Sequence, residues 1–137
     1  MSRVYVDMVA DLFHIGHINI LKQARNHGDY LIVGIHNDKD VESYKRIPII
    51  DENDRYEIVR QCKLVDEVIE NAPLVITEEY IKKHKIDYVF HGDDTNIDYS
   101  QQHMIPLGLG IMVYGKYTPG ISTSSIIDKI KYPLDLE

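Results

Sequence analysis

Short apolar runs alternate along this chain with segments whose apolar residues recur at helical spacing. The runs at residues 3–9 and 30–36 are nearly continuous in apolar residues, which is typical of parallel strands covered on both faces. The residues between them form an apolar stripe at helical spacing: Ile15, Ile18, Ile20, Leu21 and Ala24. We expect Gly28 to end this helix in a left-handed conformation. The amino-terminal part of the chain therefore predicts a β-α-β unit.

Further elements follow in the same alternating order. Strands are predicted near residues 64–69, 86–91 and 110–114. Asp51 and Thr77 are predicted N-caps of two intervening helices. After a Pro-Gly turn, a last helix is predicted from an apolar stripe made by Ile126, Ile127 and Ile130.

The alternation predicts a single α/β domain over residues 1–137. It would hold a Rossmann-like, doubly wound sheet of five mostly parallel strands. Ligands of such folds bind beyond the carboxyl ends of the strands. The loops after the first, second, fourth and fifth strands are therefore the candidate sites.

Composition places the chain among ordinary globular domains, with 137 residues, 44% of them hydrophobic. Cys62 is the single cysteine, so no internal disulfide is possible and an oxidised secreted scaffold is not expected. The amino terminus lacks the apolar core of a signal peptide, and no apolar run approaches the ~18 residues of a spanning helix. We expect a cytoplasmic protein.

The charge balance excludes a general attraction to polyanions. Fifteen Lys and Arg residues stand against 22 Asp and Glu residues, a net charge of −7. Neither nucleic acid nor an anionic membrane is therefore an expected partner. We also expect no basic amphipathic extension that would bind a membrane, since the sequence to Glu137 contains none. An anionic ligand would need a local positive site.

The loop after the first strand carries the most specific chemistry. Residues 11–17 read Asp-Leu-Phe-His-Ile-Gly-His, so His14 and His17 stand three residues apart where a helix begins. Free backbone N–H groups at a helix start attract phosphate, and imidazoles add further donors. Gly16 leaves room for a ligand near the backbone. The alternative is structural: a capping His14 and a partly buried His17.

Two other sites receive little support. A dinucleotide glycine fingerprint is absent, so an NAD site is not expected. No cysteine cluster or third ligand accompanies the histidine pair, so a zinc site is not expected either. The other histidines are scattered along the chain: His27, His36, His84, His91 and His103.

Several ordered motifs carry a family resemblance. They are the H-x-G-H loop and the segments at residues 28–34, 52–56, 65–69, 91–94 and 120–124. Over residues 3–131 the chain resembles the cytidylyltransferases of the H-x-G-H nucleotidylyltransferase superfamily. It is most similar to those acting on ethanolamine phosphate and choline phosphate, and it is also similar to glycerol-3-phosphate cytidylyltransferases. The resemblance implies transfer of CMP from CTP to a phosphorylated alcohol, with Mg²⁺ bridging the triphosphate, by a homodimer.

The resemblance also implies the site residues. The catalytic residues are His14, His17 and Lys45. The acceptor phosphate is held by Lys45 and Arg55. The nucleotide is bound by Val9, Ala10, Asp11, His14, Gly16, His17, Asp94, Tyr117, Thr118, Gly120, Ile121, Ser122 and Thr123. Asp11 could orient a histidine or the metal shell.

Taken without the resemblance, these residues have plainer interpretations. Lys45 could be a solvated charge, and Arg55 could pair with an acidic residue on its own helix. Ser122 could be a helix cap. Asp94 could close a turn after the fourth strand.

The chain departs from the family pattern at two places. Met8 and Ala10 replace a glycine and an aromatic residue before Asp11, and Tyr117 replaces an arginine. Lys116 could supply the charge of that arginine but not its planar fork. Two alternatives therefore stay open: an adenylyltransferase that uses ATP, and a nucleotide-binding domain without turnover.

Overall fold

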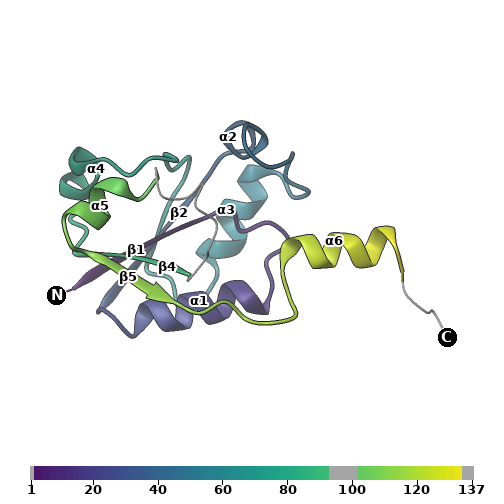
Figure 1. The fold of residues 1–137 in the computed structure, drawn as a ribbon, viewed down its shortest axis with the longest axis horizontal. Helices are drawn as coiled ribbons and strands as arrows, with labels where there is room; N and C mark the ends of the chain where they lie inside the picture. Colours follow the sequence, from purple (N-terminus) through teal and green to yellow (C-terminus); the bar gives the residue numbers. More distant parts are fainter. Residues whose placement is uncertain (1, 93–101, 134–137) are drawn as a thin grey trace.

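The computed structural model describes residues 2–92 and 102–133 and contains one five-stranded sheet. All neighbouring strands are parallel, in the order β3-β2-β1-β4-β5. The strands are β1 (Arg3–Met8), β2 (Tyr30–Ile35), β3 (Glu67–Ile69), β4 (Tyr88–Gly92) and β5 (Met112–Gly115). The predicted α/β, Rossmann-like fold is confirmed (Figure 1).

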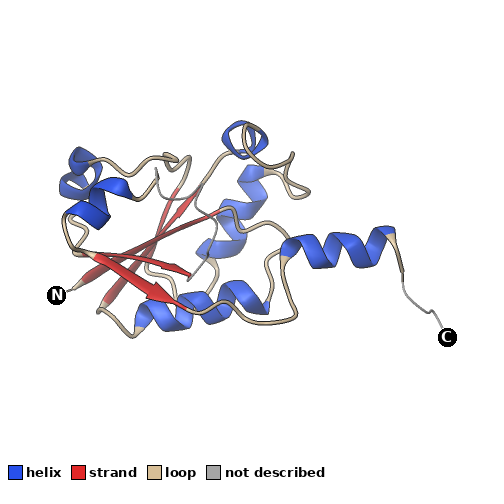
Figure 2. Cartoon of the chain, in the orientation of Figure 1, coloured by secondary structure: helices blue, strands red, loops and turns tan. Residues whose placement is uncertain are grey.

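Six helices connect and flank the strands within the described residues. They are α1 (Ile15–Arg25), α2 (Asp38–Glu42), α3 (Glu52–Arg60), α4 (Glu78–Lys83), α5 (Met104–Gly108) and α6 (Thr123–Lys131). Helices α1 and α3 pack on the same core cluster, whereas α4 and α5 appear at the upper left of the view that Figures 1 and 2 share. The predicted N-caps are confirmed: Asp51 accepts from the N–H of Asn53, and Thr77 accepts from that of Tyr80.

The central strand β1 divides the core into two clusters. Val4 and Val6 pack in the cluster that α1 and α3 complete, whereas Tyr5 packs in the cluster that holds Ile81 of α4. Successive residues of a strand point to opposite faces, so both faces must be apolar when helices cover both. This arrangement explains the continuous apolar run at the start of the chain.

The end of α1 differs from the prediction. The helix ends at Arg25, Asn26 is its right-handed C-cap, and Gly28 is not among the residues with positive φ. A Cβ at Gly28 would lie 2.6 Å from Val4 Cγ2 and 2.7 Å from the Ser2 carbonyl oxygen. Close packing against the first strand, rather than a left-handed turn, therefore requires glycine here. The side chain of Ile15 is also 51% exposed, outside the buried face of this helix.

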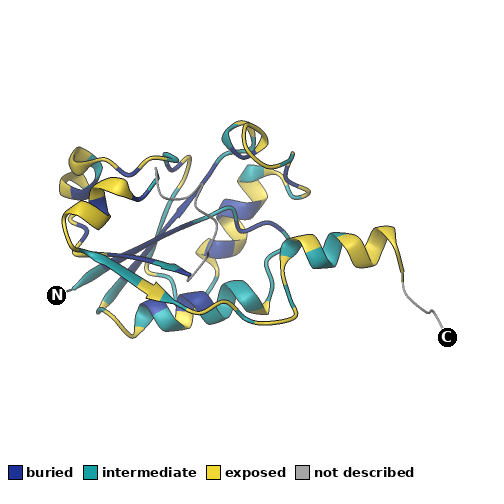
Figure 3. Cartoon of the chain, in the orientation of Figure 1, coloured by how far each residue is buried: buried dark blue, intermediate teal, exposed yellow. Residues whose placement is uncertain are grey.

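Helix α6 stands away from the sheet. Figures 1 and 3 show it projecting from the body of the molecule with mostly exposed residues. None of its residues is buried: Ile126 and Ile127 of its predicted apolar stripe are half-buried, and Ile130 is 72% exposed. Among the helices of residues 2–92 and 102–133, none has the length and apolar character needed to cross a membrane.

Candidate functional site

A cavity of about 320 Å³ opens at the carboxyl ends of the central strands. Twelve of the predicted site residues line it: Val9, Ala10, Asp11, His14, Gly16, His17, Lys45, Tyr117, Thr118, Ile121, Ser122 and Thr123. The histidine loop and the hydroxyl-rich turn, about a hundred residues apart, thus share one cavity. Gly120 is not part of its lining, and Asp94 lies outside the described residues.

The histidine pair is locked into the start of α1 by a reciprocal cap. His14 Nδ1 accepts the N–H of Gly16 at 3.0 Å, and His17 Nδ1 accepts the N–H of His14 at 3.0 Å. Because each Nδ1 is an acceptor, each neutral imidazole carries its proton on Nε2. The cap and the functional interpretation are therefore compatible, since capping fixes both rings with an Nε2–H available for donation.

Both imidazoles are held neutral. Burial lowers the pKa of His14 below its usual 6.5. Burial, followed by the neighbouring His14, lowers the pKa of His17 to about 4, with a smaller contribution from the positive charge of Lys45. The ring of His17 also stacks on Phe13, with centroids 5.3 Å apart. A neutral donor pair at this position can bind phosphate oxygens without first losing or gaining a proton.

Thr123 links the start of α6 to the histidine loop within the cavity. Its hydroxyl donates to the carbonyl oxygen of Asp11 at 2.9 Å, so its oxygen is free to accept the Nε2–H of His14 at 3.4 Å. Ser122 caps α6 by accepting the N–H of Ser125 at 3.0 Å. Two helix starts therefore converge on the same space.

The carboxylate of Asp11, which lines the cavity, binds the backbone of a neighbouring loop. Its two oxygens accept the backbone N–H groups of Ile49 at 2.8 Å and Ile50 at 2.9 Å. The side chain is thus committed to holding the loop that follows Lys45. Its neighbours Ala10 and Leu12 adopt positive φ values of 59° and 50°, which bend the chain sharply at this point.

Arg55 is not brought to the cavity, and its expected role as an acceptor-phosphate ligand needs correction. It is 0% exposed, and its guanidinium donates to the carbonyls of Val9 (2.6 Å), His36 (2.9 Å) and Ile50 (2.9 Å). It also pairs with Asp38 at 2.6 Å. All of these partners belong to the protein, so Arg55 ties together the loops that carry the site.

Tyr117 covers the end of β4. A Cβ at Gly92 would lie 2.3 Å from the Tyr117 ring, and the ring meets His91 edge-on with centroids 6.5 Å apart. The next residue, Thr118, accepts a hydrogen bond from Asn19 of α1 at 2.7 Å. The segment leading to α6 is therefore fixed against both β4 and α1.

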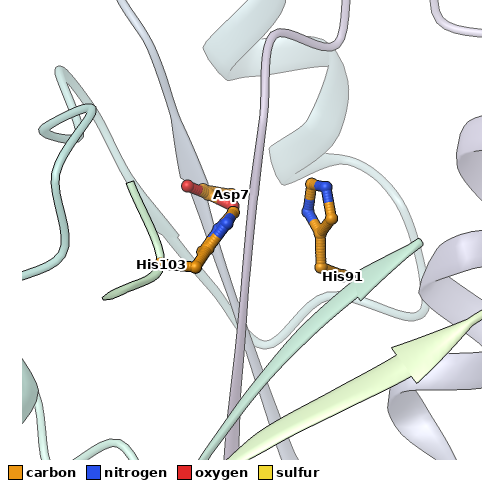
Figure 4. Close-up of side chains that lie close together, drawn as sticks. All are labelled: Asp7, His91 and His103. Carbon is orange, nitrogen blue, oxygen red and sulfur yellow. The ribbon is translucent and has the colours of Figure 1, made fainter. Parts of the chain in front are cut away.

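A second group of polar residues was missed in the sequence. Asp7, near the end of β1, lies next to His91 and His103 (Figure 4) and also next to His36, and all three were expected to be scattered histidines. Burial raises the pKa of Asp7, but the hydrogen bond from His103 and the nearby imidazoles outweigh this, so its pKa is lowered and the carboxylate is ionised. Asp7, His36 and His91 lie at or just beyond the carboxyl ends of neighbouring parallel strands, so the strand register could have predicted that they are close together. His103 carries no comparable signal, because it precedes the short helix α5.

Comparison with known proteins decides the family. The family model described as cytidylyltransferase-like matches residues 9–129, which include both the histidine loop and the start of α6. This chain belongs to the cytidylyltransferase-like family.

Relatives of this cytidylyltransferase-like chain include an ethanolamine-phosphate cytidylyltransferase of Dictyostelium discoideum, 40% identical over 133 residues. A probable choline-phosphate cytidylyltransferase of Schizosaccharomyces pombe is 43% identical over 135 residues. Each match covers 93% of this chain and 36% of the relative, so the chain spans about a third of the length of these proteins.

A solved structure shares the cytidylyltransferase-like fold over its whole length. It is the lipopolysaccharide core biosynthesis protein from Thermoplasma volcanium, with a TM-score of 0.72 and 31% sequence identity. The match covers 86% of this chain and 99% of that protein.

Proposed function

We propose that this chain transfers CMP from CTP to a small phosphorylated alcohol, such as ethanolamine phosphate, and releases pyrophosphate. The observation that carries the proposal is the convergence of the His14 and His17 donors and the start of α6 on one cavity. The names of the relatives support CTP as the nucleotide and a phosphorylated alcohol as the acceptor.

The reaction needs positive groups because both substrates are anionic. A phosphomonoester with nearly two negative charges must approach a triphosphate. Each pair of like unit charges at 4 Å costs about 4 kcal/mol at an effective dielectric of 20. Lys45 supplies a full positive charge at the cavity, and the two helix starts add partial positive charge.

The proposed step is a direct in-line displacement. An oxygen of the acceptor phosphate attacks the α-phosphorus of CTP, and the bond from that phosphorus to the oxygen bridging the β-phosphorus breaks. The bonding electrons leave with pyrophosphate, so no covalent enzyme intermediate forms. Lys45 positions the acceptor phosphate, while the Nε2–H groups of His14 and His17 stabilise charge on the transferred and leaving phosphates.

Magnesium enters this scheme as part of the substrate, the Mg²⁺ complex of CTP. The carboxylates that line the described part of the cavity are those of Asp7 and Asp11. Asp11 is committed to two backbone N–H groups, and Asp7 is enclosed by imidazoles. Phosphate oxygens are therefore the better ligands for this ion.

A substrate screen with pyrophosphate detection tests the proposal. CTP, Mg²⁺ and a phosphorylated alcohol together should release pyrophosphate, and omission of any one should abolish the release. The screen includes ATP because Tyr117 stands where the family has arginine. Turnover with ATP and none with CTP would reject the proposal in favour of an adenylyltransferase. Nucleotide binding without release for any acceptor would indicate a binding domain.

The role of the histidine pair has its own test. A His17→Ala protein should lose about 10²–10³-fold in kcat, the usual effect of removing one donor to developing negative charge. Full activity in a folded His17→Ala protein would contradict the assignment.

A further inference from the structure

Arg46 differs from the other four arginines of the chain. Each of those pairs with a carboxylate: Arg3 with Glu67, Arg25 with Asp66, Arg55 with Asp38 and Arg60 with Glu70. Among the residues that the structure describes, Arg46 forms no such pair, and its Nε is buried without a hydrogen-bond acceptor. Its side chain lines the cavity that also contains Lys45 and the histidine pair. The guanidinium of Arg46 is thus placed at the proposed substrate site.

A buried guanidinium N–H without an acceptor indicates a ligand. The guanidinium stays protonated at physiological pH, so it cannot escape the cost of burial by losing its proton. A buried donor that lacks an acceptor destabilises a fold, and it does so most where the donor is charged. Folded proteins rarely keep such groups. An anion that enters the cavity would supply the acceptor that the described part of the protein does not.

The loop that carries Arg46 is anchored on both sides of it. Before Arg46, the N–H of Lys45 donates to the carbonyl oxygen of Val41 in α2 at 2.9 Å. After it, the N–H of Ile49 donates to Asp11 Oδ2 at 2.8 Å. Only three residues lie between these two anchors, so the backbone at Arg46 has little freedom to move away from the cavity.

The residues that follow Lys45 alternate between the cavity and solvent. Arg46 and Pro48 line the cavity, whereas Ile47 and Ile49 are 64% and 59% exposed. Such alternation is the pattern of an extended segment with one face toward the protein. The position of Arg46 at the cavity therefore follows from the path of its backbone.

We propose that Arg46 binds the phosphate of the acceptor together with Lys45. This inference rests on the proposed transfer reaction, whose acceptor is a phosphomonoester with nearly two negative charges. Lys45 and Arg46 supply two positive charges from adjacent residues at the cavity. The planar guanidinium can also donate two parallel hydrogen bonds to phosphate oxygens. Arg46 thereby takes the role expected for Arg55, whose guanidinium binds protein groups instead.

The acceptor suits the position of Arg46 better than the nucleotide does. The charge of Lys45 contributes to the lowered pKa of His17, whereas that of Arg46 does not. Of the two cations, Arg46 is therefore the more distant from the histidines assigned to the nucleotide phosphates. In-line attack requires the acceptor to lie opposite the leaving pyrophosphate, so a phosphate held away from the histidine pair is well placed for it.

Arg46→Gln tests the inference through the two Michaelis constants. The KM for ethanolamine phosphate should rise about 10- to 100-fold, the usual loss for a charged hydrogen bond, while the KM for CTP stays within about twofold. Arg46→Lys keeps the charge but not the fork, and its KM should fall between the two. Arg60→Gln is the matched control, because Arg60 pairs with Glu57 and Glu70 and does not line the cavity. Its Michaelis constants should be those of the wild type.

Thermal unfolding distinguishes phosphate binding from a structural role. Because the described protein offers Arg46 Nε no acceptor, Arg46→Gln without ligand should unfold at the wild-type temperature or above it. Ethanolamine phosphate should raise the unfolding temperature of the wild type and of Arg60→Gln, but not that of Arg46→Gln. A lower unfolding temperature for Arg46→Gln, with an unchanged response to ethanolamine phosphate, would show a structural role and overturn the inference.

Calorimetry separates this inference from the proposed function. Ethanolamine phosphate is titrated into the protein with Mg²⁺ and α,β-methylene-CTP, whose bridging CH₂ group prevents transfer. If the wild type turns over no acceptor, the proposed function fails, yet weaker binding in Arg46→Gln than in the wild type and Arg60→Gln would still support the role of Arg46. Equal binding by the wild type and Arg46→Gln, no binding by the wild type, or an equal rise in both Michaelis constants would each overturn it.

Discussion

The absence of a side chain at Gly16 determines where the imidazole ring of His14 can lie. A Cβ at this position would lie 2.8 Å from His14 Cε1 and 2.9 Å from its Nδ1, the atom that accepts the Gly16 N–H. Any side chain here must therefore displace the imidazole. The glycine of the H-x-G-H loop allows the cap to form, in addition to leaving space for a ligand.

Gly16→Ala should reduce turnover without unfolding the protein. Displacement of a positioned group by about 1 Å can cost about 10²-fold in rate. Alanine also favours a helix over glycine by about 1 kcal/mol, which offsets part of the clash. Steady-state kinetics and thermal unfolding measure the two effects. Gly108→Ala is the control, because a Cβ there meets nothing within 4 Å. Wild-type kcat in Gly16→Ala would show that the cap geometry is unimportant.

The lowered pKa of His17 predicts a pH-dependent stability. In the unfolded chain this imidazole titrates near 6.5, and in the folded chain near 4. Between these values the unfolded state holds a proton that the folded state lacks, so stability falls as the pH drops from 6.5 to 4. The loss is on the order of 3 kcal/mol at most. Denaturant titration at several pH values in this range measures the free energy of unfolding. This free energy should depend less steeply on pH in folded His17→Asn than in the wild type, and an identical pH dependence would contradict the assignment.

At the scale of elements, the sequence pattern predicted the strands but not the short helices. Both faces of β1 and β2 are covered, which produces the continuous apolar runs that predicted them. Helices α2 and α5 have only five residues each, too few to display a 3.6-residue period. The cluster around Asp7 was missed for a related reason, because its members come from four segments far apart in the sequence that only the folded topology brings together.

Arg55 illustrates an element-level role that a motif cannot distinguish from ligand binding. Its guanidinium joins the loop after β1, the end of β2 and the segment before α3. Arg55→Met would leave these acceptors and Asp38 without their donor, and we expect a loss of about 3 kcal/mol or more in urea unfolding. Lys45→Met is the matched control and should keep its stability but lose activity. An Arg55→Met protein with wild-type stability and a raised KM for the acceptor would restore the original expectation.

At the scale of the whole molecule, helix α6 is the element on which the predicted homodimer can be tested. A nine-residue helix with no buried residue is too short to be stable by itself, and its Ile130 is largely exposed. The capping Ser122 fixes only one end of it. The homodimer that the family resemblance implies stays a prediction, and in it we expect Ile130 of α6 to be covered.

Light scattering coupled to size-exclusion chromatography tests this assembly. The wild-type chain should elute with twice the mass of 15.9 kDa, and Ile130→Asp should shift it toward the monomer. Lys129→Asp, on the same helix, is the control for added negative charge. A wild-type monomer at working concentration would reject the homodimer.

The central claim is that the capped histidines and the start of α6 hold one chain of nucleotide phosphates. NMR titration of the ¹⁵N-labelled protein with CTP and Mg²⁺ tests it most directly, by following the imidazole nitrogens and backbone amides together. We predict that the resonances of His14, His17 and Thr123 shift in parallel with one binding constant, while those of His27 and His84 stay in place. Shifts confined to His27 and His84, or to only one of the two cavity regions, would contradict the account.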